Sequence, residues 1–162
     1  METMTTTQTV RPLTVEELPL CVEAAQAFHD EMGLDGTFAP EGFLKHWAFF
    51  LTSCPAVIFG LWKDDGLVGG FGAMLAPDIN TSRLVANEFF WYVNQEHRGG
   101  TGALRLLKAF EAWGTEKEAT VFRLVHLLGP EETTQEAKLS SLYTKLGYHP
   151  VELTWQKTKE AV

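Results

Sequence analysis

The stretch VNQEHRGGTGALRLL, Val93–Leu107, decides how this chain is interpreted. It continues an apolar run, Phe89–Val93, that is typical of a buried strand, and it leads into an amphipathic helix over Ala103–Trp113. The first N–H groups of a helix have no partners within the helix, and together with the helix dipole they attract an anion. Glycines in the turn leave the backbone bare, so that a diphosphate can approach these amides. The stretch therefore predicts a strand–turn–helix unit that binds a phosphorylated ligand; a glycine-rich turn without a ligand is the alternative.

The rest of the chain predicts alternating helices and strands around this unit. Thr14–Glu17 has the Thr-x-x-Glu pattern of a capping box and predicts a helix to about Met32, in which Pro19 marks a kink or the true start. Asp64–Gly66 predicts a hairpin turn. The other expected elements are a weak strand Val10–Leu13, a helix Glu41–Ser53, strands Ala56–Trp62, Leu67–Leu75 and Arg83–Asn94, a loop Pro77–Ser82, a strand Thr120–Leu128, a loop Gly129–Thr134, a helix Gln135–Leu146 ended by Gly147, and a strand Val151–Lys157. This order predicts an α/β fold with a sheet of mixed direction and at least one parallel crossover.

Composition limits the classes of function. The chain has 162 residues and a formal net charge of -8, which disfavours nucleic acid as a partner. Its two cysteines, Cys21 and Cys54, form no metal-binding or disulfide pattern and suit a reducing compartment. Neither a signal peptide nor an apolar run long enough for a membrane helix is present, so we expect a cytoplasmic protein without a membrane partner. A flexible N-terminus, residues 1–8, and a single domain, residues 9–162, are expected.

Two segments resemble motifs of the GNAT superfamily of N-acyltransferases. The turn is similar to the acyl-CoA-binding pattern Arg/Gln-x-x-Gly-x-Gly/Ala, with Arg98 first, Ala103 last, and Thr101 in place of the middle glycine. A second register starts at His97 and uses the same loop amides. Leu142–Tyr148, LYTKLGY, resembles the Leu-Tyr-x-x-Leu-Gly-Phe/Tyr segment of the family's last helix. The Asn that often precedes this Tyr by about two turns is replaced by Glu136.

The resemblance implies a fold and a co-substrate. The fold is a mixed central sheet, mostly antiparallel with a parallel splayed pair, flanked by helices on both faces. The co-substrate is acetyl-CoA, without a metal. Its pantetheine arm lies where the central strand ends in a bulge near Tyr92–Asn94 and parts from the strand Thr120–Leu128. The residues implied in its binding are Tyr92, Val93, Asn94, Arg98, Gly99, Gly100, Thr101, Gly102 and Ala103.

The resemblance also implies direct transfer of the acyl group to an amine. Tyr143 is the candidate acid that protonates the leaving thiolate, and a backbone N–H at Val93 or its neighbour polarises the carbonyl. Glu88 is the candidate base, because a carboxylate within an apolar strand is costly and is often functional. Packing of Tyr143 in the core, and a structural role of Glu88 at a splayed strand edge or beside Arg83 or Arg123, are the alternatives. His126 is the rival base.

The acceptor is expected to be an amine of a small molecule or a protein. Its site is expected between the hairpin, the loop Pro77–Ser82 and the first two helices, a region that contains the aromatic residues Phe38, Phe43, Trp47, Phe50 and Trp62; plain core packing is the alternative. A catalytically silent module that binds CoA, or that serves as a structural or partner protein, is the alternative function. A homodimer is possible by resemblance.

Overall fold

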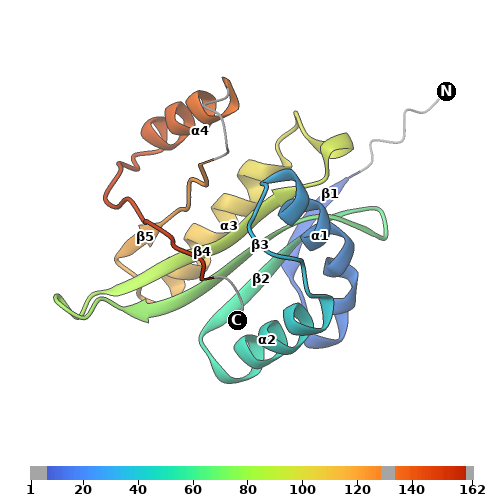
Figure 1. The fold of residues 1–162 in the computed structure, drawn as a ribbon, viewed down its shortest axis with the longest axis horizontal. Helices are drawn as coiled ribbons and strands as arrows, with labels where there is room; N and C mark the ends of the chain where they lie inside the picture. Colours follow the sequence, from blue (N-terminus) through green and yellow to red (C-terminus); the bar gives the residue numbers. More distant parts are fainter. Residues whose placement is uncertain (1–6, 129–133, 160–162) are drawn as a thin grey trace. The chain divides into compact units, whose positions relative to one another are not determined.

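The computed structural model describes residues 7–128 and 134–159, the side chains of residues 134–137 excepted. It divides into two compact units, Met1–Val125 and His126–Val162, which are described separately. The first unit contains a five-stranded sheet in the order β1-β2-β3-β4-β5 (Figure 1). The strands are β1 Gln8–Pro12, β2 Ala56–Lys63, β3 Gly66–Pro77, β4 Leu84–Val93 and β5 Val121–Arg123. β1 to β4 pair antiparallel and β4 pairs parallel with β5, which confirms the predicted mixed sheet.

Helices cover both faces of this sheet, as predicted. The helix α3, Gly102–Glu116, packs on one face, while the 3-10 helix η1, Val15–Cys21, and the helix α2, Pro40–Ser53, pack on the other (Figure 1). Strand β2 shows why both faces are covered: Phe59 and Leu61 face α3, and Ile58 and Trp62 face α2 and η1. A strand that is apolar on both sides requires a cover on each.

The helix predicted from Thr14–Glu17 to about Met32 consists of two separate elements in the structure. Residues Val15–Cys21 form the 3-10 helix η1, and only Val22–Glu31 form the α-helix α1. Pro19 lies within η1, and the α-helix begins only at Val22, after the residue that would interrupt its backbone hydrogen bonds. The Thr14 backbone N–H donates to the Glu17 carboxylate at 3.0 Å, as a capping box requires.

Strand β4 differs from prediction at two places. Its bulge lies at Phe89, because Phe90 pairs with Gly72 and Glu88 pairs with Ala73, whereas the resemblance implies one near Tyr92–Asn94. Its parallel partner β5 has three residues, where Thr120–Leu128 is predicted. Beyond Arg123 the chain leaves β4: the Val125 N–H donates to the Glu88 carboxylate at 2.8 Å, where a longer strand would use a neighbouring carbonyl. The two strands therefore part after Asn87, which agrees with the implied splay.

The second unit contains the helix α4, Thr134–Lys145. Gly147 follows it with a φ of +88°, and the Tyr148 N–H donates to the Tyr143 carbonyl at 2.9 Å, as expected for a glycine that ends a helix. The prediction of a strand Val151–Lys157 is wrong, because these residues have no regular structure. A strand needs a neighbour for its N–H and C=O groups, and the described residues of this unit include no other strand. The predicted loop Gly129–Thr134 lies mostly outside the described residues.

No helix in the described part of the chain combines the length and the apolar character that crossing a bilayer would need.

Candidate active site

A short 3-10 helix, η2 (Gln95–His97), follows β4, and the predicted glycine-rich turn then leads directly into α3. No side chain caps the helix at Thr101. Gly99 and Gly100 are open: an added Cβ would meet nothing within 4 Å at either position. Gly102 is different, because a Cβ there would lie 2.6 Å from a methyl group of the fully buried Leu61. The loop therefore presents bare backbone in front of the helix N-terminus, while Gly102 holds the helix against the sheet.

The Arg98 side chain makes contacts within the protein. Its Nε donates to the Val93 carbonyl at 2.7 Å, and its two terminal nitrogens bind both oxygens of Glu31 at 2.6 and 2.9 Å. The guanidinium also lies 5.1 Å from the centre of the Tyr92 ring. The Arg98 guanidinium lowers the pKa of Glu31. We name Arg98, Glu31 and the Val93 carbonyl the Arg98 clamp; it ties the loop to the end of α1 and the end of β4.

Glu31 is the member of this clamp that the sequence did not reveal. It precedes Arg98 by 67 residues, and it appears in the sequence only as one more acidic residue on an amphipathic helix. No spacing rule joins two residues so far apart.

The end of β4 turns one amide toward its open edge. The Asn94 N–H donates to the Val68 carbonyl of β3 at 2.9 Å. Because hydrogen-bonded and non-hydrogen-bonded residues alternate along an antiparallel pair, the backbone groups of Val93 point away from β3. The Arg98 bond to the Val93 carbonyl comes from that side. The Val93 N–H therefore faces the edge where β5 has already left the sheet.

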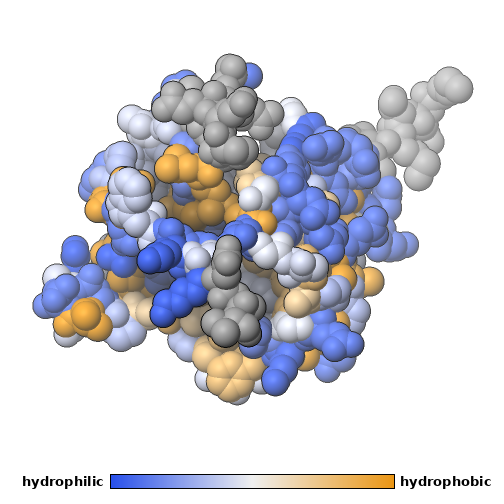
Figure 2. All heavy atoms as spheres, in the orientation of Figure 1, coloured by the Kyte–Doolittle hydropathy of each residue, from blue (hydrophilic) through white to orange (hydrophobic). Residues whose placement is uncertain are grey.

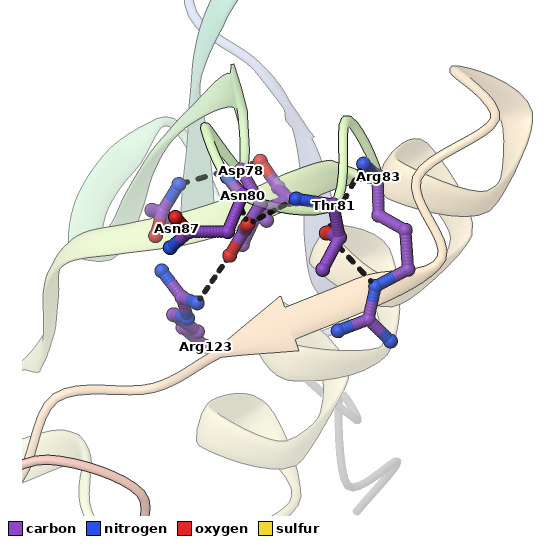
Figure 3. A network of polar contacts seen from close by, with 7 residues as sticks. Asp78, Asn80, Thr81, Arg83, Asn87 and Arg123 are labelled. Atoms are coloured by element: carbon purple, nitrogen blue, oxygen red, sulfur yellow. Dashed lines mark hydrogen bonds and ion pairs between the residues drawn. The ribbon is translucent and has the colours of Figure 1, made fainter.

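Glu88 lies at the splay of β4 and β5 with a strongly shifted pKa. Burial raises the pKa of Glu88 to about 7, and the bond from the Val125 N–H opposes that shift in part. Neither arginine considered as a structural partner reaches it. Arg123 pairs with Asp78 at 3.4 Å, and the Arg83 Nε donates to the Thr81 hydroxyl at 3.2 Å (Figure 3).

The Asp78 network belongs to the hairpin between β3 and β4. The Asp78 carboxylate accepts bonds from the backbone N–H groups of Asn80 and Thr81, both at 2.9 Å (Figure 3). These amides, Thr81 first, lower the pKa of Asp78. Ile79 is exposed in the turn between β3 and β4. The predicted loop Pro77–Ser82 is thus a structured turn whose carboxylate also holds β5 through Arg123.

An apolar cavity of about 190 Å³ lies between α1, α2 and the ends of β3 and β4. Of the aromatic residues proposed for the acceptor region, Phe38 and Phe43 line it, whereas Trp47, Phe50 and Trp62 pack into the core below α2 and η1. The remaining wall comes from α1, from the 34–38 segment and from the strands: Cys21, Ala24, Ala25, Phe28, His29, Leu34, Leu67, Gly69, Gly70, Phe90 and Tyr92. The face of α1 that lines the cavity is apolar, whereas hydrophilic residues cover its outward face (Figure 2).

Cys21 is a thiol in the wall of this cavity. Burial raises the pKa of Cys21 to about 11, so the side chain is protonated at neutral pH. Because the thiolate is the nucleophile, Cys21 is a poor acyl carrier. Among the residues that the structure describes, no group of three His, Cys, Asp or Glu side chains is placed to hold a metal ion.

The second unit brings together Tyr143 and His126. The two rings lie edge to face with centroids 6.4 Å apart, and Tyr143 lies 6.2 Å from Tyr148. The His126 Nδ1 lies 3.3 Å from the Ser140 hydroxyl. Tyr143 is half-buried, so its position is compatible with both packing and proton donation.

Comparison with known proteins identifies the fold. No protein-family model and no curated protein matches the sequence. Solved structures do match: a predicted acetyltransferase with acetyl-CoA from Clostridium acetobutylicum has a TM-score of 0.74 at 13% identity, covering 94% of this chain and 96% of that one. The chain has the GNAT fold.

Further structures with this fold differ in the acceptor that they are named for. An aminoglycoside acetyltransferase from an uncultured soil metagenomic sample, in complex with sisomicin, has a TM-score of 0.72 at 14% identity and covers 94% of this chain and 97% of its own. Glucosamine-6-phosphate N-acetyltransferase from Arabidopsis thaliana has a TM-score of 0.65 at 12% identity, with 94% and 98% covered. The GNAT fold is thus common to structures named for chemically different acceptors.

Proposed function

We propose that this GNAT-fold chain is an N-acyltransferase, with acetyl-CoA as the acyl donor and an amine as the acceptor. The uncapped N-terminus of α3 behind the open Gly99 and Gly100 carries the proposal. Such a turn suits the diphosphate of CoA. Support also comes from the fold, because similar structures are named acetyltransferases and one of them holds acetyl-CoA.

In the proposed reaction a bond forms between the amine nitrogen and the acyl carbon, and the carbon–sulfur bond breaks. Glu88 takes the proton of the ammonium group through a water molecule, for which a pKa of about 7 is well matched at neutral pH. The Val93 N–H, directed toward the open edge of β4, donates to the developing oxyanion. Tyr143 protonates the leaving thiolate, and the second proton that the nitrogen loses on becoming an amide restores the Tyr143 phenol. In this proposal transfer is direct, and Cys21, which is held as a thiol, does not carry the acyl group.

Ligand binding tests the first half of this proposal. Acetyl-CoA at 100 times its Kd should stabilise the folded protein by about 2.7 kcal/mol. For a chain of this size that is a rise in Tm of about 5–10 °C. ATP at the same concentration is the control for a loop that binds any phosphorylated ligand. An unchanged Tm with millimolar acetyl-CoA would contradict the proposal.

A CoA-binding module without turnover is the second candidate function. The Arg98 clamp favours it, since the first side chain of the motif is engaged with Glu31. Release of free CoA thiol in the presence of a panel of amines separates the two candidates. Binding of acetyl-CoA without thiol release for any amine would favour the module.

A further inference from the structure

The cavity beside β4 indicates what kind of amine the protein accepts. It is walled almost entirely by carbon: aromatic rings from Phe28, Phe38 and Phe90, alkyl side chains, and the backbone of two glycines. None of its lining residues is acidic, and His29 is the only one with a titratable nitrogen. Such walls stabilise an apolar group and offer few partners to hydroxyls, which lose their bonds to water on entering.

The cavity is partly open to solvent and is large enough to admit a small ligand. An apolar cavity of about 150 Å³ is enough to hold a benzene ring in another protein, and the volume here is about 190 Å³. One six-membered ring or one branched alkyl chain therefore fits.

Gly70 supports the same conclusion from the sheet. It lies within β3, where glycine weakens a strand and often marks the close approach of a ligand. A Cβ at Gly70 would lie 3.3 Å from the ring of Phe90, so a larger side chain would reduce the space on the cavity floor. The glycine keeps open a volume that an ordinary strand residue would occupy.

The cavity lies next to the proposed reacting atoms. Tyr92 and Gly69 line it, and Val93, which follows Tyr92 and pairs with Gly69, carries the amide proposed to polarise the carbonyl. We propose that the acceptor is a primary amine joined by a short linker to an apolar ring or branched alkyl group. The apolar group occupies the cavity, and the nitrogen remains at the open edge of β4. This inference rests on the proposed acyl transfer and specifies its acceptor.

Matched amines test the proposal. Benzylamine and isopentylamine carry an apolar group of suitable size, and ethanolamine and glucosamine carry polar ones. With acetyl-CoA and the wild-type protein, kcat/KM from thiol release should be at least tenfold higher for the apolar amines. Equal or higher kcat/KM for the polar amines would overturn the proposal.

Cavity-filling variants test whether the preference for apolar amines arises in this cavity. Ala25 lines the cavity from α1, so Ala25→Leu should raise the KM for benzylamine at least tenfold and leave the KM for acetyl-CoA unchanged. Ala27→Leu, on the same helix but outside the cavity, is the matched control. Ala24→Leu fills the cavity from the neighbouring position should Ala25→Leu fail to fold. An unchanged KM for benzylamine in a folded cavity variant would overturn the proposal.

Benzyl alcohol separates this proposal from acyl transfer itself. It retains the ring and has no amine, so its binding, measured by ligand-observed NMR, requires no acetyl-CoA. The expected result is binding to the wild type and to Ala27→Leu but not to Ala25→Leu. If this pattern appears and acetyl-CoA does not bind, acyl transfer fails and with it the acceptor role, although the apolar site stands. If acetyl-CoA binds and benzyl alcohol does not, only the acceptor class is wrong.

Discussion

Glu88 changes protonation within the pH range in which the proposed reaction would operate. Its pKa of about 7 follows from burial, and the Val125 N–H, its hydrogen-bond donor, does not compensate fully. The proposed base must be deprotonated to accept a proton. We therefore expect kcat/KM to rise with pH through about 7 and Glu88→Gln to remove this limb of the profile. A profile that is unchanged in Glu88→Gln would assign the limb to another group, with His126 as the first to examine.

The same shift makes a prediction about stability. A carboxyl group whose pKa is higher in the folded state stabilises the protein below its unfolded pKa, 4.5, and loses that contribution as the pH rises through about 7. Glu88→Gln keeps an acceptor for the Val125 N–H and cannot ionise. Relative to wild type, the variant should therefore gain on the order of 3 kcal/mol between pH 4.5 and pH 8. Urea unfolding at several pH values measures this gain, and a constant difference would contradict the raised pKa.

Arg98 is predicted to position the loop; a direct contact with phosphate is the competing role. As an ion pair at the protein surface, its bond to Glu31 contributes at most about 1 kcal/mol to stability. If the clamp orders the loop, both Arg98→Lys and Glu31→Gln should weaken acetyl-CoA binding several-fold with little change in Tm, because each loses the paired hydrogen bonds. Calorimetric Kd values distinguish the roles: tighter binding in Glu31→Gln would mean that the freed Arg98 binds phosphate.

At the scale of the element, two glycines at the start of α3 have different roles: Gly100 leaves the backbone exposed, and Gly102 allows the helix to pack closely on the sheet. Gly100→Ala adds a methyl group in open space, so stability should change by less than about 0.5 kcal/mol while acetyl-CoA binding weakens. Gly102→Ala pushes a methyl group against buried Leu61, and the helix propensity of alanine offsets only part of that cost. We expect a net loss of about 1–2 kcal/mol. Chemical unfolding and acetyl-CoA titration of both variants check the pair; unweakened binding in Gly100→Ala would place the diphosphate elsewhere.

Sequence predicts an element well where the cause is local. The turn at Asp64–Gly66, Pro40 at the start of α2 and the apolar face of α3 act within a few residues, and the corresponding hairpin and helices are confirmed. The length of β5 depends on where its neighbour diverges. Whether Val151–Lys157 forms a strand depends on the presence of a partner strand. Both are long-range conditions, and composition alone made each segment look like a strand.

The candidate site divides in the same way. The glycine-rich turn and the unusual carboxylate Glu88 are visible in the sequence because each is anomalous in its own segment. The Arg98 clamp and the cavity need residues from α1, β3 and β4 together, which only the tertiary structure supplies. The roles of Tyr143 and Glu88, a cytoplasmic location and a homodimer stay predictions.

At the scale of the whole molecule, we predict that the second unit, His126–Val162, does not fold independently. A helix as short as α4, 12 residues, is marginal in isolation. Among the described residues, the buried apolar core ends at Ala119, so this unit contributes none of it. We therefore predict that residues 9–162 unfold as one domain.

Hydrogen exchange across a urea series tests this single domain. If it is correct, amides of α4 lose protection at the same urea concentration as those of β2, β3 and β4, because the helix cannot persist once the sheet unfolds. Mass spectrometry of peptic peptides resolves the two units in one sample. Amides near the N-terminus of α1 give the internal reference for local fraying. Protection of α4 that disappears well before that of the sheet would mean two separately unfolding units, with Tyr143 carried by the weaker one.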